Sequence, residues 1–153
     1  MTTPRRRRVL AVASGGGHWV QLMRLRPAFE GCDVEFASVA DAYASEVQGC
    51  RFHRLPDATR WDRWALVKLL GKVAWVVLRR RPDVVLTTGA APGLLALVAG
   101  KLIGARTVWI DSIANVEEMS LSGRQARRFA DLWLTQWEHL ATPEGPLFEG
   151  AVL

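Results

Sequence analysis

The sequence predicts an α/β fold, a Rossmann-like parallel sheet with helices on both faces. Short apolar runs alternate along the chain with longer segments of helical periodicity, which is the pattern of strands joined by crossover helices. Three consecutive glycines follow the first apolar run, as expected where a parallel strand turns into a helix. The chain has 153 residues, 50% hydrophobic and 23% charged. This length and composition fit one folded domain and exclude a disordered chain.

Proline residues mark the ends of two helices in the first half of the chain. Pro27 and Pro82 each follow a segment of helical pattern, and proline in a helix interior removes a hydrogen bond and clashes with the preceding turn. The apolar runs outside these helices are of strand length. The elements expected here are strands at residues 9–13, 34–39 and 51–55 and helices at residues 18–26 and 61–80.

The second half of the chain continues the alternation. Pro92 is placed as the first residue of a helix, where its missing N–H costs nothing, and Gly104 as the residue that ends this helix. Ser122 and Gln125 have the spacing of a capping box at the start of the next helix. The elements expected here are strands at residues 83–88, 106–110 and 130–135 and helices at residues 92–103 and 122–129.

Basic residues are concentrated toward the N-terminus. Residues 1–81 contain 15 Lys and Arg against 7 Asp and Glu, whereas residues 82–153 contain 5 against 8. This asymmetry suits an anionic partner such as a phosphate group or a membrane surface. No nucleic-acid-binding motif accompanies the charge, so we expect no nucleic acid partner. We divide the chain into a basic N-terminal tail at residues 1–8 and a single domain at residues 9–153.

Membrane-spanning and secretory segments are not predicted. No apolar stretch reaches the ~20 residues that a spanning helix needs, and no signal peptide precedes the first strand. Cys32 and Cys50 form neither a disulfide framework nor a metal-binding pair. We therefore expect a reducing, cytosolic setting, no metal site and only peripheral contact with a membrane.

A glycine-rich loop connects the first strand to the first helix. Ser14, Gly15, Gly16 and Gly17 carry few side-chain atoms, so their backbone amides and the positive end of the helix can cradle a phosphate or diphosphate. The alternative is a tight turn that needs glycine only for its backbone geometry. The loop is not a dinucleotide fingerprint, because Val20 stands in place of the third glycine, and it is not a Walker loop. Dehydrogenases and the common NTPases are thereby excluded.

Two residues at the carboxyl ends of strands are candidate catalytic groups. His18 begins the first helix, whose positive end favours the neutral imidazole that accepts a proton; alternatively it caps the helix or contacts phosphate. Asp111 ends a strand, where its carboxylate can activate a hydroxyl or position a sugar; alternatively it is an acidic cap. Loops at the same edge of the sheet are expected to bind substrate. The substrate-binding candidates are Ser14, Gly15, Gly16, Gly17, Thr88, Gly89, Ser112, Asn115 and Glu117.

The helix expected at residues 61–80 has an apolar side and a mixed side. When the helix is projected at ~100° per residue, the side expected to face the sheet carries Leu66, Leu69, Leu70, Val73 and Val77. Tryptophans share the opposite side with basic residues. This mixture is typical of a helix that lies in a membrane interface. The alternative is a solvated basic face whose tryptophans pack against neighbouring elements. The membrane-contact candidates are Trp61, Trp64, Lys68, Lys72, Trp75 and Arg79.

Several segments resemble glycosyltransferases. Residues 14–18, Ser-Gly-Gly-Gly-His, resemble the glycine-rich loop in the N-terminal half of GT-B glycosyltransferases. Residues 111–116, 120–123 and 130–137 resemble the signature of a two-subunit group. That group contains the membrane-side subunit of the eukaryotic dolichol-linked chitobiose-forming transferase and its bacterial exopolysaccharide relatives. The similarity covers residues 9–153, nearly the whole chain.

The sequence departs from the eukaryotic members of this group at two points. Those members carry an N-terminal transmembrane anchor, whereas residues 1–8 alone precede the first strand here. They also tend to carry glutamate and arginine where this sequence has Asp111 and Asn115, which is closer to the bacterial pattern. The resemblance therefore implies a bacterial setting, in exopolysaccharide or capsule biosynthesis, at the cytoplasmic face of the plasma membrane.

The resemblance implies the N-terminal, acceptor-side half of a split GT-B enzyme. A separate chain would bind the UDP-sugar, and this chain would bind a lipid-diphosphate-linked saccharide and remove a proton from its hydroxyl through His18 or Asp111. No cofactor is expected beyond the UDP-sugar as co-substrate. One alternative is a non-catalytic scaffold that recruits the catalytic partner to the membrane. Another is a stand-alone nucleotide-binding module.

The C-terminal tail is the expected contact with the partner chain. In the resemblance it occupies the place where a one-chain enzyme crosses to its second domain. Five of its last seven residues are apolar, and an apolar terminus indicates burial against something. The alternative is that the tail folds back on its own sheet. The partner-contact candidates are Gln136, Trp137, Phe148, Val152 and Leu153.

Overall fold

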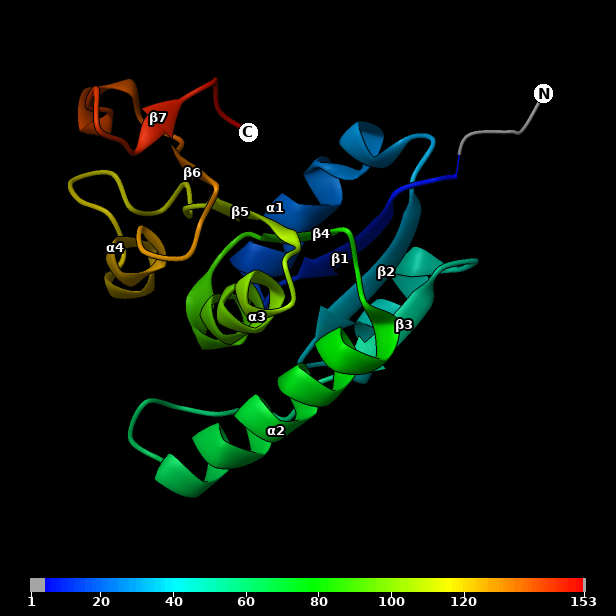
Figure 1. The fold of residues 1–153 in the computed structure, drawn as a ribbon. Helices are drawn as coiled ribbons and strands as arrows, with labels where there is room; N and C mark the ends of the chain where they lie inside the picture. Colours follow the sequence, from blue (N-terminus) through cyan, green and yellow to red (C-terminus); the bar gives the residue numbers. More distant parts are fainter. Residues whose placement is uncertain (1–4, 153) are drawn as a thin grey trace.

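The computed structural model describes residues 5–152 and contains a sheet of seven strands in the order β3-β2-β1-β4-β5-β6-β7 (Figure 1). Every neighbouring pair of strands is parallel. The predicted Rossmann-like parallel sheet is therefore confirmed. The strands are β1 (Arg8–Val12), β2 (Asp33–Ser38), β3 (Arg51–Arg54), β4 (Val84–Thr87), β5 (Arg106–Ile110), β6 (Leu132–Thr135) and β7 (Leu147–Phe148).

Helices cover both faces of the sheet because successive strand residues point to opposite sides. Along β1, Val9 and Ala11 pack into a cluster around Trp19 of α1, whereas Leu10 and Val12 pack into a second cluster with α2 and α3. The α-helices are α1 (Gly17–Arg24), α2 (Arg63–Arg80), α3 (Ala90–Leu102) and α4 (Leu121–Ala126), and short 3₁₀ helices lie at Arg26–Phe29, Asp41–Val47 and Glu138–Leu140.

The strand order changes direction between β1 and β4. β1 pairs with β2 on one side and with β4 on the other, so the chain winds outward from this point in both directions. In parallel sheets of this kind, ligands bind beyond the carboxyl ends of the strands at such a switch point. Here that position lies between the start of α1, which follows β1, and the start of α3, which follows β4.

Each α-helix begins at a residue other than the one predicted, and capping side chains explain the starts of α2 and α4. α2 starts at Arg63 because the Asp62 carboxylate accepts a hydrogen bond from the Ala65 amide at 2.9 Å and caps the helix, which leaves Trp61 outside it. The predicted capping box at Ser122 is wrong. Ser120 is the N-cap instead, since its hydroxyl accepts a hydrogen bond from the Gly123 amide at 2.9 Å.

α3 begins at Ala90 rather than at the predicted Pro92. Gly89, at φ 131°, and Ala90, at φ 64°, turn the chain sharply into the helix. Pro92 is then the third helical residue, which still lies in the first turn, where an N–H has no partner within the helix. The start of the helix is thus closer to the end of β4 than the proline indicated.

Residues near both ends of the chain belong to the folded domain to a greater extent than predicted. Arg8 belongs to β1 rather than to the tail, and Arg5 of the tail donates a hydrogen bond to the Asp83 carboxylate at 2.6 Å. β7, which was not predicted, adds residues of the C-terminal tail to the sheet beside β6. Residues 1–4 and Leu153, which were predicted to belong to the basic tail and to the partner contact, lie outside the described residues. Within residues 5–152, no helix is both long and apolar enough to cross a membrane.

Candidate functional site

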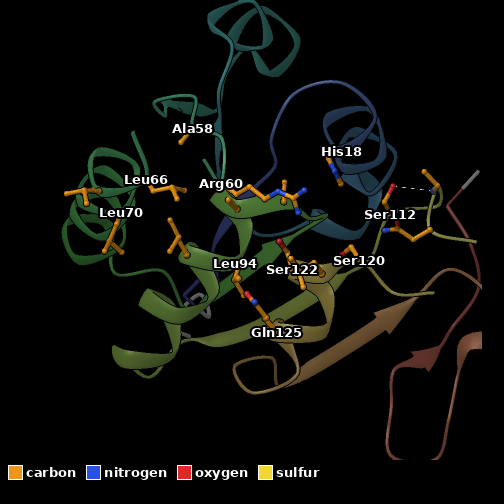
Figure 2. A pocket seen from close by; sticks show the side chains of 17 residues that line it. His18, Ala58, Arg60, Leu66, Leu70, Leu94, Ser112, Ser120, Ser122 and Gln125 are labelled. Atoms are coloured by element: carbon orange, nitrogen blue, oxygen red, sulfur yellow. Dashed lines mark hydrogen bonds between the residues drawn. The ribbon is translucent and has the colours of Figure 1, made fainter. Parts of the chain in front are cut away.

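A cavity of about 780 Å³ opens beyond the carboxyl ends of β1, β4 and β5. The turn into α1 contributes His18, and the loop from β5 to α4 contributes Ser112 and Asn115. Figure 2 shows His18 and Ser112 on one side of this cavity and Leu66 and Leu70 of α2 on the other. The structure thus brings together three of the predicted site residues from two separate loops.

His18 is held in one orientation by Thr88. Its Nδ1 lies 2.8 Å from the Thr88 carbonyl oxygen, and the Thr88 hydroxyl donates a hydrogen bond to the His18 carbonyl at 2.6 Å. A carbonyl oxygen only accepts, so Nδ1 carries the proton of the neutral ring. The lone pair of Nε2 is then available to accept a proton.

Gly89 leaves the space in which the His18 ring lies. A Cβ at this position would be 2.8 Å from both Cε1 and Nδ1 of His18, shorter than any ordinary contact. The φ of 131° at Gly89 is also one that side-chain-bearing residues rarely adopt. Thr88 and Gly89, both predicted to bind substrate, are buried, and they act on the site by positioning His18.

The glycine-rich loop combines a tight turn with an open surface. Gly16 has φ 64° and ψ −134°, which requires glycine, and its amide donates to the Tyr43 hydroxyl at 2.9 Å. A Cβ on Gly15 would lie 3.3 Å from that hydroxyl. Gly17 has no positive φ, and a Cβ added there would meet no atom within 4 Å. The turn therefore explains the first two glycines, and the third leaves room for a ligand at the start of α1.

The Asp111 carboxylate is buried, with 1% of the residue exposed, and its hydrogen-bonding capacity is taken up inside the protein. It accepts from Trp109 Nε1 at 3.0 Å, from Asn115 Nδ2 at 3.0 Å, and from the amide and hydroxyl of Ser120 at 2.9 and 2.6 Å. A Cβ on Gly123 would come within 2.5 Å of the same carboxylate. This geometry favours a role in folding the β5–α4 loop over proton transfer.

Two buried glutamines hold the backbone of the same loop. Gln21 of α1 and Gln136, which follows β6, both donate to the Asp111 carbonyl at 3.1 Å, and the Ile113 amide donates to Gln21 at 3.2 Å. The loop that carries Ser112 is thereby fixed from both sides.

The remaining substrate-binding candidates, Ser14 and Glu117, do not line the cavity. Ser14 is half-buried, and its carbonyl accepts a hydrogen bond from the Ser38 hydroxyl at 3.3 Å. Glu117 is exposed further along the β5–α4 loop.

Other residues of the cavity were not predicted from the sequence. Arg60, in the segment before α2, lies between the apolar and polar sides of the cavity in Figure 2. Ser120, Ser122 and Gln125 line the floor beside it. A basic residue immediately before a predicted helix was a usable signal for Arg60, whereas the serines could be placed only once the start of α4 was known. Among residues 5–152, no group of three His, Cys, Asp or Glu is arranged to hold a metal ion.

Most of the predicted membrane-contact residues are exposed on α2 or, for Trp61, just before it, whereas Lys72 is half-buried. Trp61 and Trp64 are 80% and 79% exposed, and Trp75 is about half exposed. Lys72 Nζ lies 4.7 Å from the centre of the Trp75 ring, a cation–π contact, while Lys68 and Arg79 face solvent. The alternative in which these tryptophans pack against neighbouring elements does not apply to Trp61 and Trp64.

The C-terminal tail folds back on its own sheet, as the alternative interpretation predicted. Phe148 belongs to β7 and pairs with Thr135 of β6. The Val152 amide donates to Gln136 Oε1 at 2.7 Å, and Trp137 Nε1 donates to the Ile113 carbonyl at 2.8 Å. These contacts connect the tail to the β5–α4 loop. A contact of the same residues with a partner chain stays a prediction.

The chain shares sequence features with known oligosaccharide biosynthesis proteins. The family described as "Oligosaccharide biosynthesis protein Alg14 like" matches residues 61–146, more than half of the chain. The UDP-N-acetylglucosamine transferase subunit ALG14 of Mus musculus is 25% identical over 182 residues, covering 90% of this chain and 79% of the mouse protein. The corresponding subunit of Schizosaccharomyces pombe is 34% identical over 86 residues, covering 52% of this chain and 40% of the yeast protein. Both relatives are eukaryotic, so they give no support to the predicted bacterial setting.

Solved structures share the fold. MurG of Acinetobacter baumannii matches with a TM-score of 0.68 at 14% identity, over 95% of this chain and 44% of MurG. A UDP-N-acetylglucosamine 2-epimerase from Rickettsia bellii matches with a TM-score of 0.68 at 15% identity, over 88% of this chain and 40% of the epimerase. The chain thus spans less than half the length of these structures, and its fold is that of one half of a GT-B protein, as predicted.

Proposed function

The chain belongs to the family of Alg14-like oligosaccharide biosynthesis proteins, and from this premise we propose that it is the acceptor-side subunit of a split inverting glycosyltransferase. A separate partner chain binds the UDP-sugar, and this chain binds the lipid-diphosphate-linked saccharide that receives the sugar. The names of the relatives, which describe subunits of UDP-N-acetylglucosamine transferases, support the division into subunits and this donor.

The observation that carries the proposal is the arrangement of His18. Among the described residues that line the cavity, the ionisable side chains are those of His18 and Arg60, and only histidine accepts a proton near neutral pH. Thr88 fixes the tautomer in which Nε2 is free. A base that is oriented by a backbone carbonyl at a sheet switch point is suited to activating a hydroxyl group.

In the proposed reaction, His18 Nε2 accepts the proton of the attacking hydroxyl on the acceptor sugar. The hydroxyl oxygen forms a bond to the anomeric carbon of the donor sugar from the face opposite UDP. The bond between that carbon and UDP breaks, its electrons leave on the phosphate oxygen, and the configuration inverts. UDP remains with the partner chain, and the imidazolium releases its proton to solvent. We name no cofactor besides the UDP-sugar.

The diphosphate of the acceptor is placed between the starts of α1 and α3. The start of α1 lines the cavity through His18 and the start of α3 through Ala90 and Ala91, and unpaired amides at a helix start attract anions. Gly17, just before His18, has open space around it. Arg60, which also lines the cavity, supplies a full positive charge. Ser112 and Asn115, at the same end of the cavity as His18, supply hydrogen-bonding groups for the sugar.

The exposed tryptophans and basic residues of α2 support peripheral attachment to the cytosolic face of a membrane. Trp64 and Trp75 supply amphipathic rings, and Lys68 and Lys72 supply charges that an anionic surface attracts. The cavity wall includes Leu66, Val67 and Leu70 of the same helix. A lipid-linked acceptor that is anchored in the bilayer therefore needs to travel only a short way to reach the cavity.

The second candidate function, a scaffold that recruits a catalytic partner, is favoured by the internal saturation of Asp111. With this carboxylate engaged in four hydrogen bonds, catalysis by this chain depends on His18 alone. If the partner supplied the base, His18 would be dispensable. The two functions therefore differ in what they predict for one residue.

Replacing His18 in the reconstituted pair separates the two candidates. His18→Ala should lower the rate of transfer by about 10²- to 10⁴-fold, the usual contribution of a general base, while the variant still co-purifies with its partner. The matched control is His139→Ala, which removes an exposed histidine that lies outside the cavity wall. Wild-type turnover by the His18 variant would favour the scaffold.

A further inference from the structure

The cavity has two chemically different ends. Its polar end carries His18, Ser112 and Asn115, and its other end is a wall of aliphatic side chains (Figure 2). Apart from alanines, the apolar residues of this wall come from three helices: Leu66, Val67 and Leu70 of α2, Leu94 and Leu95 of α3, and Leu121 of α4.

Several of these aliphatic side chains face open space rather than protein. Val67 is 57% exposed, Leu70 is 46% exposed and Leu121 is 53% exposed, although all three border the same cavity. Aliphatic residues that gather around a cavity of this size, with a few polar groups at one end, are typical of a site for a ligand with an apolar part. A ligand that consists only of a sugar and a diphosphate has no apolar group to contact this wall.

The charge distribution sets the direction in which such a ligand lies. Arg60 is the one full positive charge among the described residues of the wall, and in Figure 2 it separates Leu66 from His18. Among the described residues, no Asp or Glu lines the cavity. A ligand with a diphosphate at Arg60, a sugar toward His18 and a hydrocarbon chain toward α2 matches this order.

The same helix connects the apolar wall to the surface proposed for membrane contact. Val67 lines the cavity and is exposed, and the exposed Trp64 precedes it by three residues, so the two side chains are neighbours on the surface of α2. A hydrocarbon chain that leaves the cavity past Val67 therefore reaches Trp64, one of the side chains proposed to contact the bilayer. This continuity selects a chain attached to the acceptor over an unrelated apolar peptide.

We propose that the α2–α3–α4 end of the cavity is a binding site for the hydrocarbon segment adjacent to the diphosphate of the acceptor lipid. This inference rests on the proposed function. It adds that the protein recognises the first part of the lipid chain directly, in addition to the bilayer holding the remainder. The site then selects against water-soluble sugar diphosphates, and it withdraws the start of the chain from the membrane.

A series of soluble acceptor analogues tests the proposal. All analogues carry the same sugar and diphosphate, and the length of the alkyl chain increases from one analogue to the next. The Kd of each analogue for the 153-residue protein is measured without vesicles and below the critical micelle concentration of the analogue. We expect the Kd to fall by about fourfold for each CH₂ that enters the cavity and then to level off once the wall is covered. A Kd that is independent of chain length, with the sugar diphosphate itself bound, would overturn the site while leaving the proposed function intact. Failure of every analogue to bind would count against the proposed function itself.

A matched pair of leucine variants locates the site. Leu70→Gln changes a wall residue, whereas Leu78→Gln changes a leucine of α2 that is 58% exposed and does not line the cavity. Both variants remove one exposed leucine from α2, and neither residue is buried. We expect Leu70→Gln to raise the Kd of the longest analogue about tenfold and Leu78→Gln to leave it unchanged. Equal effects of the two variants would overturn the proposal.

A competition arm distinguishes the source of the hydrocarbon. A short-chain phosphatidylcholine presents acyl chains without a sugar diphosphate, so it should displace the analogue only at concentrations far above those of the unlabelled analogue. Displacement at equal concentrations would show that the wall binds bilayer lipid generally, and it would overturn the assignment to the acceptor.

Discussion

Gly89→Ala places a methyl group where the His18 ring now lies. The added Cβ would be 2.8 Å from Cε1 and Nδ1, whereas ordinary contacts lie at 3.4–4 Å. The ring cannot move away without losing the hydrogen bond from Nδ1 to the Thr88 carbonyl oxygen, which is 2.8 Å long. The substitution also forces alanine into φ 131°, at a cost of about 1–3 kcal/mol of folding free energy.

The expected result is a folded protein with a displaced base. We expect Gly89→Ala to unfold at a lower temperature than wild type and to lower transfer by the reconstituted pair by about 10²-fold or more, since His18 loses its orientation. The ¹⁵N shifts of the imidazole, which report the tautomer, should show loss of the single Nδ1–H form. Gly31→Ala is the matched control: its φ of 79° imposes strain, but its Cβ meets no atom within 4 Å. The control should lose stability and keep activity, and Gly89→Ala with wild-type turnover and tautomer would refute the reasoning.

Three further variants test other parts of the structure. Asp111→Asn should lower the free energy of unfolding by about 2–3 kcal/mol, because it leaves buried donors facing an NH₂ group; an inactive variant of wild-type stability in denaturant titration would instead assign Asp111 a catalytic role. The Arg8 amide and Arg5 lower the pKa of Asp83 to about 2, so its stabilisation is present above pH ~4 and is lost as pH falls toward 2. Asp83→Asn should therefore destabilise the protein at neutral pH by about 1 kcal/mol, because solvent screens this partly exposed ion pair, with the difference disappearing near pH 2 in acid unfolding curves. Changing Lys68, Lys72 and Arg79 to Glu should release the protein from anionic vesicles, since each basic residue contributes about 1 kcal/mol there; unchanged flotation would exclude α2 as the contact.

The order of the strands and helices could be predicted because it depends on local patterns. Apolar runs of strand length and prolines after helices reappear in the structure as β1 to β6 and as the ends of α1 and α2. β7 was missed because a strand of two residues has no pattern of its own and forms only by pairing with β6. The cap of α4 was misplaced since Ser120 and Ser122 are equally good caps in sequence, and the position of Asp111 selects Ser120.

The candidate site was predictable where residues follow strands directly. His18, Ser112 and Asn115 were placed correctly at the cavity because the carboxyl ends of parallel strands meet at one edge. The orientation of Asp111 could not be read in this way, since its donors come from Trp109 and from Ser120 beyond the loop. The apolar wall could not be predicted either, because Leu66 and Leu70 of α2, which the helical projection places on the side facing the sheet, border an open cavity together with Leu94 and Leu95 of α3.

The division of substrates between two chains is the central claim, and equilibrium binding to this chain alone tests it most directly. The isolated protein is titrated with a soluble sugar-diphosphate acceptor analogue and, separately, with UDP-N-acetylglucosamine. We expect saturable binding of the acceptor analogue, weakened by Arg60→Gln, and no tight binding of UDP-N-acetylglucosamine. Tight binding of UDP-N-acetylglucosamine without any binding of the acceptor analogue would contradict the claim.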